Sequence, residues 1–187
     1  MTAPAGAPTG AAARHGFASS LSADEFKALF RGHPGGVAVI TADAGDGPVA
    51  LTATSVVSVS AEPPLLIFSI SALSSSSDAL SRAETVVVHL LDANDIDVAK
   101  LGASRGVDRF AQAQSWSRLP TGEPVYDGVR AWVRCAVIDR MDAGTSTVIA
   151  AHALESGFGR EVGAGDAGDA LVYHNRAWHR LSDQSRI

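Results

Sequence analysis

Apolar residues along this chain recur mostly at the two-residue spacing of strands, and only briefly at the spacing of helices. Short runs bounded by turn residues predict strands, at residues 37–41, 49–60, 65–70, 85–91, 129–139, 147–154 and 170–174. The run 65–70 is apolar at nearly every position, which predicts a strand buried on both faces. The turn cluster at 43–47 makes the first two runs a hairpin.

Helical spacing is confined to three short stretches. Ser22 and Glu25 form a capping box, and Phe26, Leu29 and Phe30 follow at helical spacing until the glycine-rich segment 32–36. Further helices are predicted at 78–83 and at 95–103, the latter capped by Asn94. Between these elements and the later strands, segment 105–127 predicts a long ordered loop, and 157–169 predicts a mobile hairpin loop.

Many short strands with few short helices predict a mostly β protein, in which a closed β-barrel carries helices at its rim. The length of 187 residues suits one domain, expected at 21–187 after a flexible tail at 1–20 that is rich in Ala, Gly, Pro and Thr. No Gly-x-Gly-x-x-Gly element follows a strand, which argues against a Rossmann nucleotide site.

Charge and composition exclude several classes of protein. The net charge of −5 and the absence of a basic stripe argue against nucleic-acid binding, and no apolar stretch approaches the ~20 residues of a membrane span. Cys135 is the only cysteine, so no disulfide can form within the chain, which fits a reducing cytoplasm. It lies in an apolar run and is expected to be buried and unreactive.

Two hydroxyl-rich segments are candidate ligand sites. The segment 52–60 alternates small hydroxyl residues with apolar ones, so a flat ligand could lie against its backbone. On composition alone, an edge strand with a solvated face explains it better. The segment Ser74-Ser75-Ser76-Ser77 precedes a helix and could bind phosphate. A flexible loop whose last serine caps that helix explains it equally well.

Two further segments combine arginine or histidine with aromatic residues. In Asp108-Arg109-Phe110, the arginine could hold a phosphate or stack on an adenine; a surface arginine beside an anchoring phenylalanine is the alternative. The segment 173–181 could line a pocket for an aromatic ligand, or could close the barrel with Trp178 in the core. His174 and His179 have no acidic or cysteine partners nearby in the sequence, so no metal site is predicted.

Taken in order, these segments resemble the flavin reductase family, which has the FMN-binding split-barrel fold and includes the reductase components of two-component flavin monooxygenases. The resemblance runs from about Phe26 to Leu181. It is carried by the following segments: 36–41, 52–55, 58–60, 63–65, 74–76, 108–110, 173–174 and 178–181.

The resemblance implies an NAD(P)H:flavin oxidoreductase. Such an enzyme transfers hydride from a nicotinamide nucleotide to FMN or FAD and supplies reduced flavin to a partner monooxygenase. A homodimer with the flavin near the subunit interface is also implied. The implied flavin-binding residues are Thr52, Ala53, Thr54, Ser55, Ser69, Ile70, Ser71, Ser74, Ser75, Ser76, Arg109 and Phe110. Ser146, Tyr173 and Trp178 would lie on the nicotinamide side. No catalytic acid or base is implied, because hydride transfer depends on the alignment of two rings.

One departure from the family pattern limits this inference. The family often carries Gly-Asp-His where this chain has Gly144-Thr145-Ser146. The choice between NADH and NADPH therefore stays open, although the negative charge and the lack of an arginine motif for a ribose phosphate favour NADH. Two alternatives also stay open: a split barrel with a permanently bound flavin that acts on another substrate, and a non-catalytic flavin- or haem-binding module.

Overall fold

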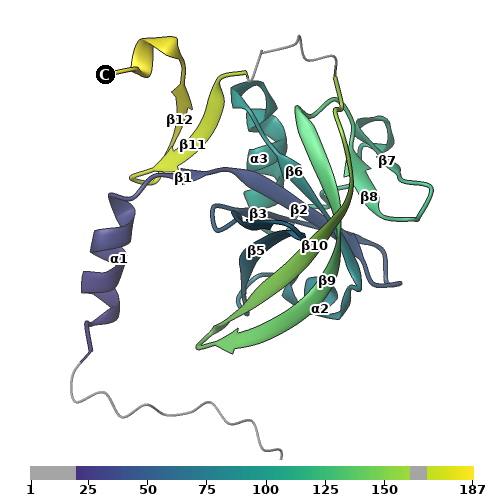
Figure 1. The fold of residues 1–187 in the computed structure, drawn as a ribbon, viewed down its shortest axis with the longest axis horizontal. Helices are drawn as coiled ribbons and strands as arrows, with labels where there is room; N and C mark the ends of the chain where they lie inside the picture. Colours follow the sequence, from purple (N-terminus) through teal and green to yellow (C-terminus); the bar gives the residue numbers. More distant parts are fainter. Residues whose placement is uncertain (1–19, 161–167) are drawn as a thin grey trace, which may run out of the picture.

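Helix α1 (Ala23–Arg31) begins the folded part of the chain in a computed structural model, which describes residues 20–160 and 168–187. Residues 1–19 of the tail predicted at 1–20 and residues 161–167 of the loop predicted at 157–169 lie outside the described residues. The predicted capping box is confirmed: the Ser22 hydroxyl accepts from the Glu25 amide at 3.2 Å, and the Glu25 carboxylate accepts from the Ser22 amide at 2.9 Å. No residue of α1 is buried, and the helix stands beside the sheets (Figure 1).

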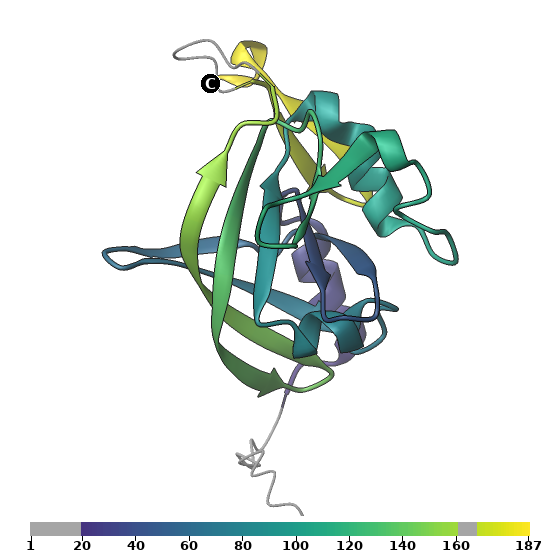
Figure 2. The same ribbon diagram turned by 90° about the vertical axis from the view of Figure 1, so that its right-hand side faces the viewer.

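A seven-stranded sheet in the order β3-β2-β6-β9-β10-β5-β4 forms the body of the fold. Its strands, all antiparallel to their neighbours, are β2 (Ala38–Asp43), β3 (Pro48–Ala53), β4 (Val57–Ala61), β5 (Pro64–Ser71), β6 (Thr85–Leu90), β9 (Ala131–Ala143) and β10 (Ser146–Gly157). The sheet curls round into a barrel (Figure 2). The prediction of a mostly β fold with short peripheral helices is confirmed.

The strand predicted at 49–60 is in fact two strands. β3 ends at Ala53 and β4 begins at Val57. At the bend between them, the Ser55 hydroxyl accepts from the Ser69 amide in β5 at 3.0 Å. This bond links the bend to β5, the strand next to β4, so the hydroxyl-rich segment passes from one edge strand of the sheet, β3, to the other, β4.

The prediction that 65–70 is buried on both faces is wrong. In β5, Leu66, Phe68 and Ile70 are buried in the barrel core, whereas the residues between them are only half-buried. The strand therefore has one core face and one partly open face, because successive side chains point to opposite sides of a sheet.

The loop predicted at 105–127 contains an unpredicted hairpin, formed by β7 (Trp116–Arg118) and β8 (Pro124–Tyr126). Two long-range bonds hold it on the barrel. The Thr41 hydroxyl donates to the Pro124 carbonyl at 2.5 Å, and the Tyr126 amide donates to His89 at 3.0 Å. A third sheet joins β1 (Gly35–Gly36), β11 (Ala170–His174) and β12 (Ala177–Leu181); the last strand was also not predicted.

The remaining helices are short: α2 (Ser77–Arg82), α3 (Ile96–Ala103), and the single 3₁₀ turns η1 (Ala93–Asp95), η2 (Ala113–Ser115) and η3 (Asp183–Ser185). The prediction that Asn94 caps α3 is wrong. Asp92 accepts from the Asn94 amide at 2.8 Å and so caps η1, which leads into α3. None of the helices in the described ranges is long and apolar enough to cross a membrane.

Two apolar clusters fill the interior. One lies inside the barrel and includes Ile40, Phe68, Val88 and Ile149. The other lies outside the barrel wall, where α3, β8 and β11 cover β2, and its centre includes Phe110 and Tyr126. The second cluster matters for function, because Phe110 and the adjacent Arg109 belong to the predicted flavin site.

Candidate functional site

Two of the segments predicted to bind phosphate meet in the structure, although they are far apart in the sequence. Arg109 Nη1 donates to Ser76 Oγ at 3.3 Å, and Nη2 donates to the Ser104 carbonyl at 2.5 Å. Ser76 is buried, and its hydroxyl donates to the Ala50 carbonyl at 2.8 Å. A guanidinium has five N–H donors, so Nη1 and Nη2 each keep a second N–H beyond these bonds, whereas Arg109 Nε is buried without a hydrogen-bond partner among the described residues. The arginine is therefore held in place with donors to spare for an anion.

The neighbouring serines have different environments. Ser75 is exposed, whereas Ser74 is half-buried and accepts from the Ser76 amide at 3.3 Å. The alternative in which the last serine caps the helix is not supported, because α2 has no side-chain cap and the Ser77 hydroxyl donates to the Ser74 carbonyl at 2.8 Å. The serine segment is thus an ordered turn with one hydroxyl facing outward.

The hydroxyl-rich segment 52–55 is divided between structural and accessible groups. Thr52 donates to the Ala99 carbonyl at 2.6 Å and so ties β3 to α3. Ala53 is buried, and Ser55 is bound to β5 as described above. Thr54 is the exposed member of the set and lines a cavity. Of the four residues, Thr54 and Ser55 are best placed to border a ligand.

The segment 69–71 contributes its residues to two faces. The Ile70 side chain is only 1% exposed and belongs to the barrel core, so the prediction that it forms part of a pocket wall is wrong for its side chain. Ser69 and Ser71 lie on the opposite, more open face. Ser71 pairs in register with Ser146, the first residue of β10, which also pairs with the end of β9 at the β9–β10 hairpin.

A cavity of about 700 Å³ lies between α1 and the sheets; we call it the basic pocket. Its lining consists of Phe26, Lys27, Phe30, Arg31, His33, Gly35, Thr54, Ser55, Val57, Tyr173, His174, Asn175 and Arg176. Three of the predicted site residues, Thr54, Ser55 and Tyr173, therefore share this pocket. The Trp178 ring packs edge-to-face on Tyr173 with centroids 4.9 Å apart. No carboxylate belongs to this described lining.

Ser146 does not join Tyr173 and Trp178. It lies at the β9–β10 hairpin, which reaches the end of the barrel remote from β11 and β12 (Figures 1 and 2). The three residues predicted on the nicotinamide side are thus not brought together within this one chain.

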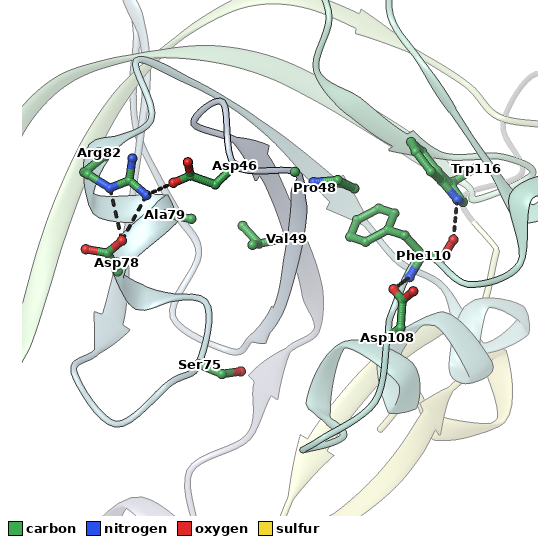
Figure 3. Close-up of a pocket in the computed structure, with 11 residues that line it drawn as sticks. Asp46, Pro48, Val49, Ser75, Asp78, Ala79, Arg82, Asp108, Phe110 and Trp116 are labelled. Atoms are coloured by element: carbon green, nitrogen blue, oxygen red, sulfur yellow. Dashed lines mark hydrogen bonds and ion pairs between the residues drawn. The ribbon is translucent and has the colours of Figure 1, made fainter.

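A second cavity, of about 520 Å³, lies beside Ser76 and Arg109 and is called here the acidic pocket (Figure 3). It is lined by Asp46, Gly47, Pro48, Val49, Ser75, Asp78, Ala79, Arg82, Asp108, Phe110 and Trp116. Arg82 bonds to Asp46 at 2.5 Å and to Asp78 at 3.0 Å. Both pairs are well exposed to solvent, so they order the rim more than they stabilise the fold.

Phe110 contributes to this wall differently from the prediction. It is 8% exposed and stacks on Tyr126 with centroids 5.3 Å apart, so most of the ring is core and cannot close over a ligand. The Tyr126 hydroxyl donates to the Arg109 carbonyl at 2.9 Å. The buried aromatic pair therefore fixes the backbone that presents Arg109.

Buried polar groups support this wall from behind. His89 is buried and bridges the Val39 carbonyl and the Tyr126 amide, each at 3.0 Å. Its burial lowers its pKa to about 4, so the ring is neutral at neutral pH. Burial alone would raise the pKa of Glu123, but hydrogen bonds from Thr121, Thr85 and Arg134 bring it to about 2. The β7–β8 hairpin is thus held to the barrel by a neutral histidine and by an ion pair of 2.7 Å between Arg134 and Glu123.

Several pocket residues were not predicted from the sequence. Trp116 and Asp46 line the acidic pocket, and Lys27 and Arg31 line the basic pocket. The isolated tryptophan in a segment rich in Gly, Pro and Ser was the available signal for Trp116. No local pattern distinguishes the lysine and arginine of α1 from ordinary solvated charges.

Comparison with known proteins decides the family. Residues 30–182 match the model of the flavin reductase like domain. The chain belongs to this family. An "NADH:FMN oxidoreductase" of Rhodococcus qingshengii is 39% identical over 162 residues, which cover 87% of this chain and 83% of that protein.

Solved structures of family members have the same fold. A flavin reductase domain protein from Arthrobacter sp. FB24 superposes with a TM-score of 0.77 at 30% identity, covering 85% of this chain and 95% of that one. BorF, the flavin reductase component of a bacterial two-component tryptophan halogenase, gives 0.73 at 30% identity over 87% and 99% of the two chains. The predicted split-barrel fold and the resemblance to flavin reductases are both confirmed.

Proposed function

We propose that the chain is an NADH-dependent flavin reductase, which transfers hydride to FMN or FAD and supplies the reduced flavin to a partner monooxygenase. Support comes from the relative named NADH:FMN oxidoreductase and from BorF, the reductase component of a two-component system. The observation that carries the proposal is the contact between Arg109 and Ser76, which leaves a second N–H on each of Nη1 and Nη2 for an anion next to an ordered serine turn.

In this proposal the flavin phosphate is bound by Arg109 with Ser75 and Ser76. The rings lie toward Thr54 and Ser55, whose backbone and hydroxyls border the basic pocket. The nicotinamide nucleotide enters through that pocket, where the rings of Tyr173 and Trp178 offer an apolar surface and three Lys or Arg side chains favour its pyrophosphate.

The protein's task in such a reaction is to align two rings. A bound flavin supplies the ring that accepts hydride, and no side chain has to move a proton for the transfer itself. The residues named above would hold the two partners in contact and exclude water between them, which lowers the entropic cost of reaction. His33 and His174 line the same cavity as Thr54, but the alignment of two rings requires neither of them as an acid or base.

The deciding experiment is NADH oxidation followed at 340 nm, with and without added FMN or FAD. We expect turnover that saturates with added flavin. Turnover without added flavin by protein that retains its flavin through gel filtration would instead favour a permanently bound group. No turnover with NADH or NADPH would contradict the proposal and favour a binding module, a reading that the sequence Gly144-Thr145-Ser146 keeps open.

We also propose that two copies of the chain form a dimer and that it works in the cytoplasm as one domain at 21–187. The single free cysteine and the family match from 30 to 182 support the last two points. For the dimer, the support is uncovered apolar surface: on α1, Phe26, Leu29 and Phe30 are 52%, 64% and 58% exposed. Ile138, Met141 and Leu154 are exposed on the long strands β9 and β10. On α1 the Phe26 and Phe30 rings lie 4.6 Å apart, and an exposed apolar cluster of this kind is typical of an interface.

The dimer is tested by sedimentation of the intact chain and of two variants of α1. Leu29→Glu places a charge among the apolar residues and should shift the protein to monomer. Ala28→Glu places the same charge on the opposite face of the helix and should leave the dimer intact. A monomeric wild-type protein would contradict this part of the proposal.

A further inference from the structure

We propose that the acidic pocket binds the adenosine half of FAD, at a subsite that FMN leaves empty. This inference rests on the proposed function, because it takes the flavin phosphate to lie at Ser76 and Arg109. The pocket would then determine which flavins the protein accepts, and its residues would act on affinity for FAD without taking part in hydride transfer.

The position of the pocket is the first argument. Ser75 lines it and is followed by Ser76, while Asp108 and Phe110 line it from either side of Arg109. The cavity therefore adjoins the phosphate-binding groups, and it is separate from the basic pocket that contains Thr54 and Tyr173. A group attached to the flavin phosphate, which FAD has and FMN lacks, could enter it without leaving Arg109.

Size and rigidity are the second argument. The cavity of about 520 Å³ falls in the range of small-molecule sites. One wall is aromatic: the Trp116 indole donates to the Phe110 carbonyl at 2.9 Å, and the two rings pack edge-to-face with centroids 4.9 Å apart. Val49 and Ala79 lie across the cavity from this wall (Figure 3). A flat purine needs apolar surfaces of this kind.

Charge is the third argument, because it favours a nucleoside over a free phosphate. Three aspartates and one arginine line the pocket. Carboxylates accept hydrogen bonds from ribose hydroxyls and from the amino group of adenine, whereas they repel phosphate oxygens. Asp108 accepts from the Phe110 amide at 2.9 Å, which fixes its direction at the edge of the cavity near Arg109. An uncharged adenosine with its phosphates outside, at Arg109, suits this lining.

The experiment measures the dissociation constants of FMN and FAD by quenching of flavin fluorescence, together with the KM for NADH. Ala79→Leu extends a side chain into the cavity from α2, where Ala79 is half-buried. We expect it to raise the Kd of FAD by about tenfold and to leave the Kd of FMN and the KM for NADH within about twofold. Ala113→Leu, an exposed position of η2 outside the lining, is the matched control and should change neither flavin.

Asp108→Asn provides an independent variant, since its side-chain oxygen can still accept from the Phe110 amide. It should raise the Kd of FAD severalfold and that of FMN little. Equal effects on FMN and FAD, or no effect of either variant on FAD, would overturn the adenosine assignment. A raised KM for NADH with unchanged flavin affinities would also overturn it, by giving the pocket to the nicotinamide nucleotide. Failure of the wild-type protein to bind any flavin would instead overturn the proposed function itself.

Discussion

The acidic and basic pockets differ in what holds their walls. One wall of the acidic pocket packs against the core. Its Phe110 ring stacks on buried Tyr126, whose amide donates a hydrogen bond to buried His89. The basic pocket has α1 as one wall, a helix that has no buried residue. The first wall is completed by the core of the chain itself, whereas the second leaves the apolar side chains of α1 exposed.

The pockets also differ in charge, and the pocket with the more rigid walls is the acidic one. The preformed pocket carries aspartates and suits an uncharged end of a ligand, whereas the pocket beside α1 carries lysine and arginine and suits a pyrophosphate. A flavin held between them would have a rigid end and an adaptable end. We expect this difference in rigidity if flavin binds first, to the fixed site, and the nicotinamide nucleotide then enters and leaves through the adaptable one.

Acid should have the largest effect, through the support of the acidic pocket. The pKa of His89 is lowered by burial to about 4, below the ~6.5 of an unfolded chain, so the unfolded state binds the proton more tightly. Stability is therefore full above pH ~6.5 and is lost as the pH falls toward 4, by on the order of 3 kcal/mol. Urea unfolding at several pH values measures this loss.

The matched variant for this measurement is His89→Gln, which can still donate to Val39 and accept from Tyr126. It should begin less stable than the wild type and lose less stability between pH 6.5 and 4.5. Glu123 also contributes to stability, but this contribution is lost at a lower pH than that of His89, as the pH falls from 4.5 toward the Glu123 pKa of about 2. An equal pH slope in wild type and variant would show that His89 does not carry the effect.

Arg109→Ala should have the next largest effect, because Arg109 bonds to Ser76 beside the acidic pocket, where the flavin phosphate is proposed to bind. Hydrogen bonds to a charged group contribute about 1.5–3 kcal/mol, so the Kd of FMN should rise by about ten- to a hundredfold. Riboflavin has no phosphate and serves as the control ligand, with its Kd expected to stay near that of the wild type. A parallel loss of riboflavin binding would mean that Arg109 only supports the loop through Ser104.

A moderate effect is expected from Tyr173→Ala in the basic pocket. Loss of an aromatic surface for the nicotinamide should raise the KM for NADH by roughly tenfold, with the Kd of FMN little changed. Tyr173→Phe keeps the ring and its packing on Trp178 and should behave like the wild type. The KM for NADH is measured by steady-state kinetics with saturating FMN. Weakened FMN binding in Tyr173→Ala would show that Tyr173 contacts the flavin and not the nicotinamide.

The smallest effect is expected from Arg176→Gly, which removes one positive charge from the basic pocket. Arg176 has a φ of 63°, a conformation that glycine adopts without steric cost, so the melting temperature should be unchanged or higher. Loss of the positive charge should raise the KM for NADH about threefold at low salt. The difference should disappear at ~1 M salt, where exposed charges are screened; a difference that persists there would contradict an electrostatic role.

Most of the fold could be predicted because its signals are local. The capping box at Ser22 and the β-branched runs specify their elements within a few residues. The β7–β8 hairpin could not be predicted in this way, since its strands have three residues each and depend on bonds from Thr41 and His89. The exposure of α1 could not be predicted either, because periodicity identifies an apolar face of a helix but not whether another element covers it.

The candidate site was predictable only as separate parts. The resemblance to flavin reductases selected Ser76 and Arg109, but their contact across 33 positions is a product of tertiary structure. Alternation within β5 decided that Ile70 belongs to the core and Ser69 to the open face, which residue type alone does not reveal. The acidic pocket was missed because its aspartates look like ordinary solvated charges until the loop of Trp116 is placed opposite them.

The burial of Cys135 has a consequence for the working life of the protein. Reduced flavin that escapes into aerated solution reacts with oxygen to give hydrogen peroxide, and the thiolate is the form of cysteine that peroxide attacks. Cys135 has no exposed surface, and burial raises its pKa to about 12, so almost no thiolate exists at neutral pH. Oxidative damage should therefore appear at Met141, which is 59% exposed, long before it reaches the only thiol.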